Sequence, residues 1–254
     1  MFINCYYYGP HTHSMLSEHL DADLDRIASM GTHAVSLCVS ELHLELWTSK
    51  RLERICRRIR EFGMEVHAVP NRWAGLVAGW CDGFNGWSVE HADALLAGYP
   101  PHQAFSDPKH PATREHYENT LRKLFDFFDF DALIWDEPCP GIPSVIEFLD
   151  DMSAVAKTIR PGMPISLFLA SPCLDLTDSL IATNHIDYLG SDGHIRDDDY
   201  KMHRMKTTIF EAHAKHYEPL KAAGKKTFFL LEAQRHRDED LQNYLDTVER
   251  AFSL

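Results

Sequence analysis

The chain lacks several patterns that define common classes of protein. Its six cysteines form no CxxC pair, which argues against a structural zinc site. No apolar run approaches the roughly 18 residues that a membrane-spanning helix needs, and no basic segment followed by a long apolar one opens the chain. We therefore expect a cytoplasmic protein with reduced cysteines and no membrane partner.

Motifs for nucleotide binding and acyl transfer are absent as well. No glycine-rich phosphate-binding loop follows a predicted strand, and Gly-x-Ser-x-Gly does not occur, since Ser191 lies in Gly190-Ser191-Asp192-Gly193. Basic residues are in deficit, with 25 Lys plus Arg against 38 Asp plus Glu and a formal charge of -13. So acidic a chain argues against nucleic acid as a partner and leaves small neutral or sugar-like substrates open.

What the sequence does have is an alternation of short apolar runs with longer segments of helical period. This alternation predicts βα units around a parallel sheet, and 254 residues is about the length of one (β/α)8 barrel. We therefore expect a single TIM-barrel domain over residues 1–254, of undetermined oligomeric state. The expected strands are 2–8, 33–40, 64–69, 102–106, a run around Leu133, 165–169, 186–189 and 227–231; without 102–106 only seven remain.

One long segment interrupts the alternation. Between about residues 70 and 101, glycines are interleaved with Trp73, Trp80, Phe84 and Trp87. Loops of this length are usually functional or disordered, and the tryptophans disfavour disorder. Two interpretations stay open: a hydrophobic plug at one barrel end, or a surface on which Trp73, Trp80 and Trp87 stack against a sugar.

Two of the predicted strands end in carboxylates. The apolar run from Phe130 ends in Asp136-Glu137-Pro138, and the strand 227–231 ends at Glu232. Because TIM-barrel active sites lie at the carboxyl ends of the strands, we expect Glu137 and Glu232, three strands apart, to face one pocket. Two facing carboxyl groups are the minimum for glycoside hydrolysis, since one protonates the leaving oxygen and the other attacks or activates water.

These strand ends resemble those of the large clan of retaining glycoside hydrolases with (β/α)8 barrels. In that clan one strand ends in Asn-Glu-Pro, and a strand three positions later ends in the nucleophilic Glu. Trp135-Asp136-Glu137-Pro138 and Leu230-Leu231-Glu232 look like those two elements, except that Asp136 stands where Asn holds the 2-hydroxyl of the sugar. The resemblance implies Glu137 as acid/base and Glu232 as nucleophile, with no cofactor and no metal.

Other polar residues follow predicted strands and would fit a sugar site at the same rim. Asp192 and His194 are the strongest of them, because Gly193 between them permits a tight turn. The full set of predicted substrate-binding residues, besides the three tryptophans, is Tyr8, Glu41, Asn71, Arg72, Asp136, Asp192 and His194.

Three further functions remain open. Glu137, Asp192, His194 and Glu232 together could hold a divalent cation, as in a sugar isomerase or epimerase. His11 and His13 form an HxH pattern of the kind that barrel metal hydrolases use, although further histidines at middle strand ends are missing. A non-catalytic carbohydrate-binding barrel is the third. We predict a glycosidase acting on a small sugar or oligosaccharide, because a binding module has little reason to hold two like charges together.

Overall fold

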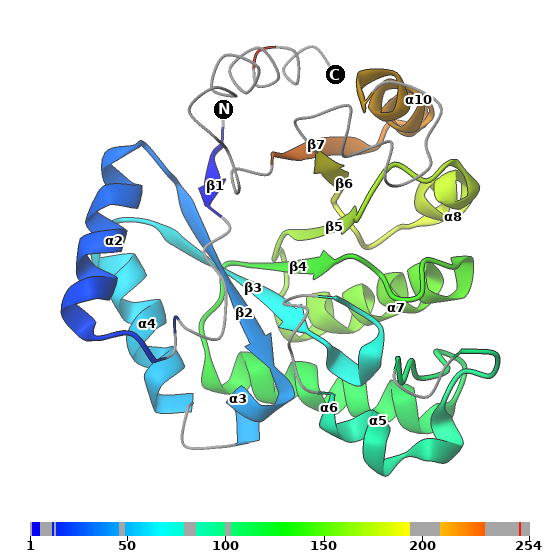
Figure 1. Ribbon diagram of the computed structural model, residues 1–254, viewed down its shortest axis with the longest axis horizontal. Coiled ribbons are helices and arrows are strands. Elements are labelled where there is room, and N and C mark those ends of the chain that lie inside the picture. Colours follow the sequence, from blue (N-terminus) through cyan, green and yellow to red (C-terminus); the bar gives the residue numbers. More distant parts are fainter. Residues whose placement is uncertain are drawn as a thin grey trace.

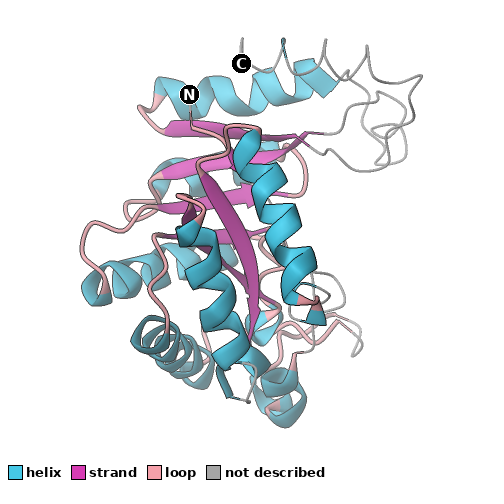
Figure 2. Ribbon diagram, turned by 90° about the vertical axis from the view of Figure 1, so that its left-hand side faces the viewer, coloured by secondary structure: helices cyan, strands magenta, loops and turns pink. Residues whose placement is uncertain are grey.

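The computed structural model describes residues 2–5, 12, 14–45, 49–78, 85–99, 103–193, 209–231 and 249. Within these ranges seven strands form one parallel sheet in the order β1 to β7, so that each strand pairs with the next along the chain. The sheet curls, and helices surround it (Figures 1 and 2). The strands are β1 (Asn4–Cys5), β2 (Ala34–Ser40), β3 (Glu65–Asn71), β4 (Ala132–Asp136), β5 (Ile165–Leu169), β6 (Tyr188–Gly193) and β7 (Lys226–Leu231).

The connections between strands carry the helices. Two of the longest begin with proline, Pro111 and Pro143, which suits a first turn whose N–H groups have no partner within the helix. The helix Ser49–Glu61 is followed by Gly63, whose φ of 79° is a conformation that glycine adopts at little cost. The helices are α2 (Ser17–Ser29), α3 (Glu41–Glu45), α4 (Ser49–Glu61), α5 (Gly86–Glu90), α6 (Pro111–Phe127), α7 (Pro143–Ile159), α8 (Thr177–Ala182) and α10 (Ile209–Ala222).

The two faces of the sheet bury two separate cores. Alternate residues such as Leu133 and Trp135 face the helices and join the main core, and the Trp135 indole donates to Ser153 of α7 over 2.8 Å. The opposite face carries a smaller cluster, which consists of Val69, Ile134 and Phe168 with Phe228 and Leu230 packed against it. We call this cluster the interior layer; it lies between the amino ends and the carboxyl ends of the strands.

Gly190 makes room for this interior layer. A Cβ atom at Gly190 would lie 2.8 Å from two ring carbons of Phe228 and 2.8 Å from its carbonyl oxygen. Phe228 in turn meets Phe168 edge to face, with 6.2 Å between the ring centroids. The absence of a side chain on β6 therefore allows an aromatic ring from β7 to fill the interior.

The predicted strand at 102–106 is wrong within the described residues 103–106. Ala104 has φ of 44°, which a strand cannot accommodate. Ser106 forms only an isolated antiparallel bridge with Leu95, so this segment folds back on its own loop. Seven parallel strands of the predicted barrel are confirmed; residues 6–8 of the predicted first strand lie outside the described ranges.

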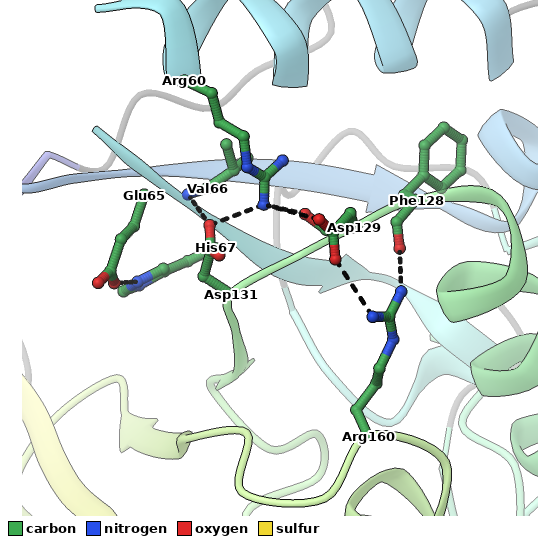
Figure 3. Close-up of polar contacts among 8 residues, drawn as sticks. All are labelled: Arg60, Glu65, Val66, His67, Phe128, Asp129, Asp131 and Arg160. Carbon is green, nitrogen blue, oxygen red and sulfur yellow. Dashed lines mark hydrogen bonds and ion pairs between the residues drawn. The ribbon is translucent and has the colours of Figure 1, made fainter. Parts of the chain in front are cut away.

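The amino ends of the strands are fixed by ion pairs. Asp131, just before β4, accepts from the Val66 amide over 2.8 Å and from the Arg60 guanidinium over 2.9 Å. Asp129 lies between the guanidinium groups of Arg60 and Arg160, at 3.8 and 3.2 Å (Figure 3). Since this end of a barrel serves stability, the carboxyl ends are left for function.

None of the helices in the described ranges is both long and apolar enough to cross a bilayer.

Candidate active site at the carboxyl ends of the strands

Three of the predicted site residues lie together at the carboxyl end of the sheet, above the interior layer. Asn71 and Asp136 come two residues after Val69 and Ile134 on their strands, so they face the same side. Asp192 on β6 lies opposite Leu230 on β7 in the register of the sheet, and Leu230 packs against that layer. Asp192 therefore faces the same side. All three are buried, with exposed fractions of 6%, 2% and 8%. The sheet therefore forms a polar rim of two carboxylates and one carboxamide over an apolar floor.

Glu137 follows Asp136 in an unusual backbone conformation. Its φ is 41°, in the left-handed region that residues other than glycine enter at a cost. Its amide donates to the Phe168 carbonyl over 3.0 Å, and its own carbonyl accepts from the Ala78 amide over 3.2 Å. The left-handed turn ends the alternation of β4 immediately after Asp136, so Glu137 does not have to face the helix layer. Such conformations cluster at functional sites, where the surroundings hold them in place.

The loop after β3 holds Glu137 in place. Val77 bridges Pro138 in antiparallel fashion, the Cys139 amide donates to the Leu76 carbonyl over 2.9 Å, and Ala78 also donates to the Asp136 carbonyl over 2.9 Å. The loop is itself strained, since Arg72 and Ala74 have φ of 57° and 44°, in the left-handed region that residues other than glycine enter at a cost. Two segments with left-handed residues thus support one another at the rim.

Glu41, another predicted site residue, is engaged with groups of the protein. Only 7% exposed, it accepts through one carboxylate oxygen from the Ala74 amide over 2.9 Å and from the His116 ring nitrogen Nε2 over 2.8 Å. One oxygen of this carboxylate therefore supports the loop, and the substrate-binding role of Glu41 stays a prediction. The partner on α6 is distant in sequence, so no local pattern indicates the pair.

Trp73 is also a structural residue. It is fully buried, its indole donates to the Val39 carbonyl over 2.9 Å, and its ring meets Tyr117 at a centroid distance of 5.9 Å. The burial of Trp73 favours the plug interpretation over the stacking interpretation for this residue. Trp87 is only partly buried and stacks on His91 and His116, with centroids 4.3 and 4.7 Å away.

Asn71 and Arg72 keep polar atoms available at the rim. The Asn71 Oδ1 and the Arg72 Nε are buried, and neither has a hydrogen-bond partner in the described part of the chain. Buried polar atoms normally have partners. A ligand at the rim would supply them, and this fits the substrate-binding role predicted for both residues.

Several predicted residues lie outside the described ranges, namely Tyr8, His11, His13, Trp80, His194 and Glu232. β7 ends at Leu231, immediately before Glu232. Within the described ranges, no three His, Cys, Asp or Glu side chains are grouped so as to hold a metal ion.

Sequence reasoning missed a buried polar group behind β6. The Ser191 hydroxyl lies 3.0 Å from the His213 Nδ1 and 3.2 Å from the Tyr217 hydroxyl, which donates to the Phe228 carbonyl over 2.8 Å. Burial raises the pKa of Tyr217 to about 12. The spacing of His213 and Tyr217, four residues apart on α10, is a signal that the sequence offered. Because Ser191 alternates with Asp192, this group lies on the helix side of the sheet and not at the rim.

Comparison with known proteins gives a likeness of fold. No protein-family model matches the chain, and no curated protein matches its sequence. The structure resembles the endo-1,4-β-D-mannanase of Thermotoga petrophila RKU-1 with a TM-score of 0.65 at 14% identity, covering 99% of this chain and 85% of that one.

Two other solved structures are similar. A GH5_18 enzyme of Streptomyces cattleya in complex with Manβ1-4GlcNAc has a TM-score of 0.53 at 15% identity, over 80% of this chain and 54% of that one. A β-glycosidase has a TM-score of 0.53 at 12% identity, over 92% and 72%. These neighbours are TIM-barrel glycoside hydrolases, and the resemblance predicted from the two strand ends is confirmed at the level of fold.

Proposed function

We propose that the chain is a glycosidase that cleaves a small sugar or oligosaccharide with two carboxylates, Glu137 as general acid/base and Glu232 as nucleophile. The observation that carries this proposal is the position of Glu137, a strained residue at the carboxyl end of β4. β7, three strands along the sheet, leads directly into Glu232. The fold shared with glycoside hydrolases supports the same conclusion.

The spacing of the strands is compatible with this pair. Neighbouring strands lie about 4.8 Å apart, so three steps amount to about 14 Å along a flat sheet. Curling of the sheet and the length of two glutamate side chains shorten this separation toward the roughly 5–5.5 Å that retaining enzymes use. Phe228 and Leu230 pack on the interior layer, and the alternation of a strand, carried on by one further step, supports the proposal that Glu232 faces the same side.

The rim around Glu137 offers polar groups for a substrate. Asp136, the residue before it, is a carboxylate only 2% exposed. Asn71, Arg72, Asp136 and Asp192 provide groups for the hydroxyls of the sugar. Tyr8, Trp80, Trp87 and His194 stay in the proposed substrate-binding set.

Replacing either glutamate tests the assignment. Glu137→Gln and Glu232→Gln should each lower kcat/KM on mannohexaose, whose sugar leaving group needs a proton, by at least about 10²-fold, because each removes a proton donor or a nucleophile. Glu147→Gln, an exposed glutamate on α7, is the matched control and should keep the full rate. Circular dichroism checks that all three variants fold. Wild-type rates in both site variants would remove the proposal.

Small anions separate the two roles. Azide should restore turnover to Glu137→Ala and Glu232→Ala, because it takes the place of a missing carboxylate. It should give a glycosyl azide of retained configuration when Glu137 is absent and of inverted configuration when Glu232 is absent. Sugar binding without turnover in the wild-type protein would instead favour a non-catalytic barrel.

A further inference from the structure

A hollow of about 280 Å³ lies between α5 and α6, outside the rim of carboxylates. α6 contributes four residues from its first turns, and α5 with the residue that follows it contributes two. The lining residues are Trp87, His91, Ala112, Glu115, His116 and Asn119.

The aromatic wall of this hollow is fixed in place. Trp87 is nearly parallel to both imidazoles, with interplanar angles of 12° to His91 and 17° to His116. The His91 Nδ1 lies 2.9 Å from the Trp87 carbonyl oxygen. Asn85 caps α5 by accepting from the Ser88 amide over 3.2 Å. Since the wall is formed in advance, a ligand does not have to order it.

The hollow is connected to the candidate active site through His116. Its Nε2 donates to Glu41, which directly follows β2, and Glu41 also holds Ala74 in the loop that supports Glu137. α6 leads into the start of β4, so its first turns lie at the carboxyl end of the sheet, and Figure 1 shows it close to α3 and α5. The hollow is therefore beside the rim, on the side of β2 and β3.

The chemistry of the lining limits the kinds of ligand. An indole, two imidazoles, a carboxylate and a carboxamide offer both donors and acceptors, whereas Ala112 is the one aliphatic side chain. Glu115 disfavours anionic ligands, and the lack of an aliphatic wall disfavours lipids. His91, Glu115 and His116 lie in the described ranges, and there no three His, Cys, Asp or Glu side chains are grouped so as to hold a metal ion.

We propose that this hollow is a second binding site, which takes one neutral sugar unit of an oligosaccharide whose scissile bond lies at Glu137. The proposal rests on the proposed function and adds a preference for longer substrates. A chain that reaches from the rim to the hollow gains hydrogen bonds that a single sugar cannot make.

Chain-length dependence is the first test. Glu115→Ala combined with Asn119→Ala should raise KM for a hexasaccharide about tenfold, the effect of one or two lost hydrogen bonds, and leave a 4-nitrophenyl monosaccharide unaffected. Glu118→Ala with Arg122→Ala, on the same helix outside the hollow, is the control and should change neither. An equal effect on short and long substrates would overturn the proposal.

Binding is measured separately from turnover. In Glu137→Gln, which should leave oligosaccharides intact, the indole N–H resonance of Trp87 is assigned by Trp87→Phe and followed during titration with mannohexaose, cellohexaose and xylohexaose. At least one should shift it, and Glu115→Ala with Asn119→Ala should abolish the shift. No shift with any of the three would overturn the second site. A shift in a protein that hydrolyses no glycoside would keep the site and remove the proposed function.

Discussion

At the scale of single residues, strain and burial mark the positions that matter. Glu137 has a left-handed backbone, and the chain places a charged side chain where glycine would be easiest. Glu41 accepts from the Ala74 amide of the loop that supports Glu137, and His116 in turn holds Glu41. The rim is therefore arranged around one glutamate at some cost in stability, as is usual for functional sites.

The strain at Glu137 predicts an inverted order of stability between two variants. Alanine ordinarily stabilises a chain relative to glycine, but at φ of 41° it carries the left-handed penalty and glycine does not. Glu137→Gly should therefore be more stable than Glu137→Ala by about 1 kcal/mol in urea unfolding. Both lack the carboxylate, so they serve as controls for each other. A more stable alanine variant would show that the backbone relaxes.

His216 predicts a loss of stability in acid. Burial lowers its pKa from 6.5 to about 4, and neither ring nitrogen has a hydrogen-bond partner in the described ranges. Because the unfolded imidazole binds a proton more readily, its contribution is complete above about pH 6.5 and falls by up to about 3 kcal/mol as the pH drops toward 4. Urea midpoints of His216→Phe should change less between pH 7 and pH 5 than those of the wild type. His19→Phe, on the exposed side of α2, should behave as the wild type.

At the scale of elements, one arrangement recurs at the amino ends of the strands. Asp131 precedes β4 and accepts from Val66 and Arg60; Asp187 precedes β6 and accepts from the Ile165 amide and the Lys157 ammonium, both over 2.8 Å. His33 precedes β2 and accepts from the Ile3 amide over 3.2 Å. In each case a side chain just before a strand accepts from a backbone amide at or next to the start of the preceding strand, and this fixes the register of the two strands. The contact occurs before β2, β4 and β6, which is every second strand.

Substitutions at Asp131 should change the stability of the protein without changing its activity. Asp131→Ala leaves the Val66 amide and Arg60 without this acceptor and should lower the free energy of unfolding by about 2 kcal/mol, while Asp131→Asn keeps one acceptor oxygen and should cost less. Neither should change kcat, because Asp131 precedes β4 and Glu137 follows it, so the two residues lie at opposite ends of the strand. Unfolding in urea and initial rates on the same samples measure both. A changed kcat in folded Asp131→Asn would connect the two ends.

The elements show which parts of the structure can be read from sequence. The strand 165–169 and the end of the strand at Leu231 were predicted as they occur, because apolar period and flanking polar residues are local signals. The prediction of a strand at Ala104 was wrong because packing against a distant residue, and not the local sequence, sets the left-handed turn there. A Cβ on Gly75 would lie 2.5 Å from the Ala104 carbonyl oxygen, so the two segments touch. The contacts of Glu41 and Trp73 could not be predicted for the same reason, since their partners, His116 and the Val39 carbonyl, lie far along the chain.

At the scale of the whole molecule, the order of the strands matters most. A parallel sheet in chain order gathers residues from distant segments, such as Asn71 and Asp192, at one edge. The sequence could predict this gathering because it follows from the alternation of strands and helices. It could not predict how α5 packs against α6, and the hollow between these two helices depends on that packing.

Metal removal tests the mechanism of the molecule as a whole. Two carboxylates hydrolyse a glycosidic bond without a metal ion, so dialysis against EDTA should leave the rate of glycoside hydrolysis unchanged. The same sample, after addition of Mg²⁺ or Mn²⁺, should show no gain. Loss of activity with EDTA and recovery with either ion would favour the isomerase or metal-hydrolase alternatives.

The aromatic rings that meet beside Gly190 fill the inner face of the described sheet directly below the rim. Under the proposed function, a sugar fragment cleaved at Glu137 would therefore leave on the side from which the substrate enters. It would occupy the rim until it departs, so the product should act as a competitive inhibitor.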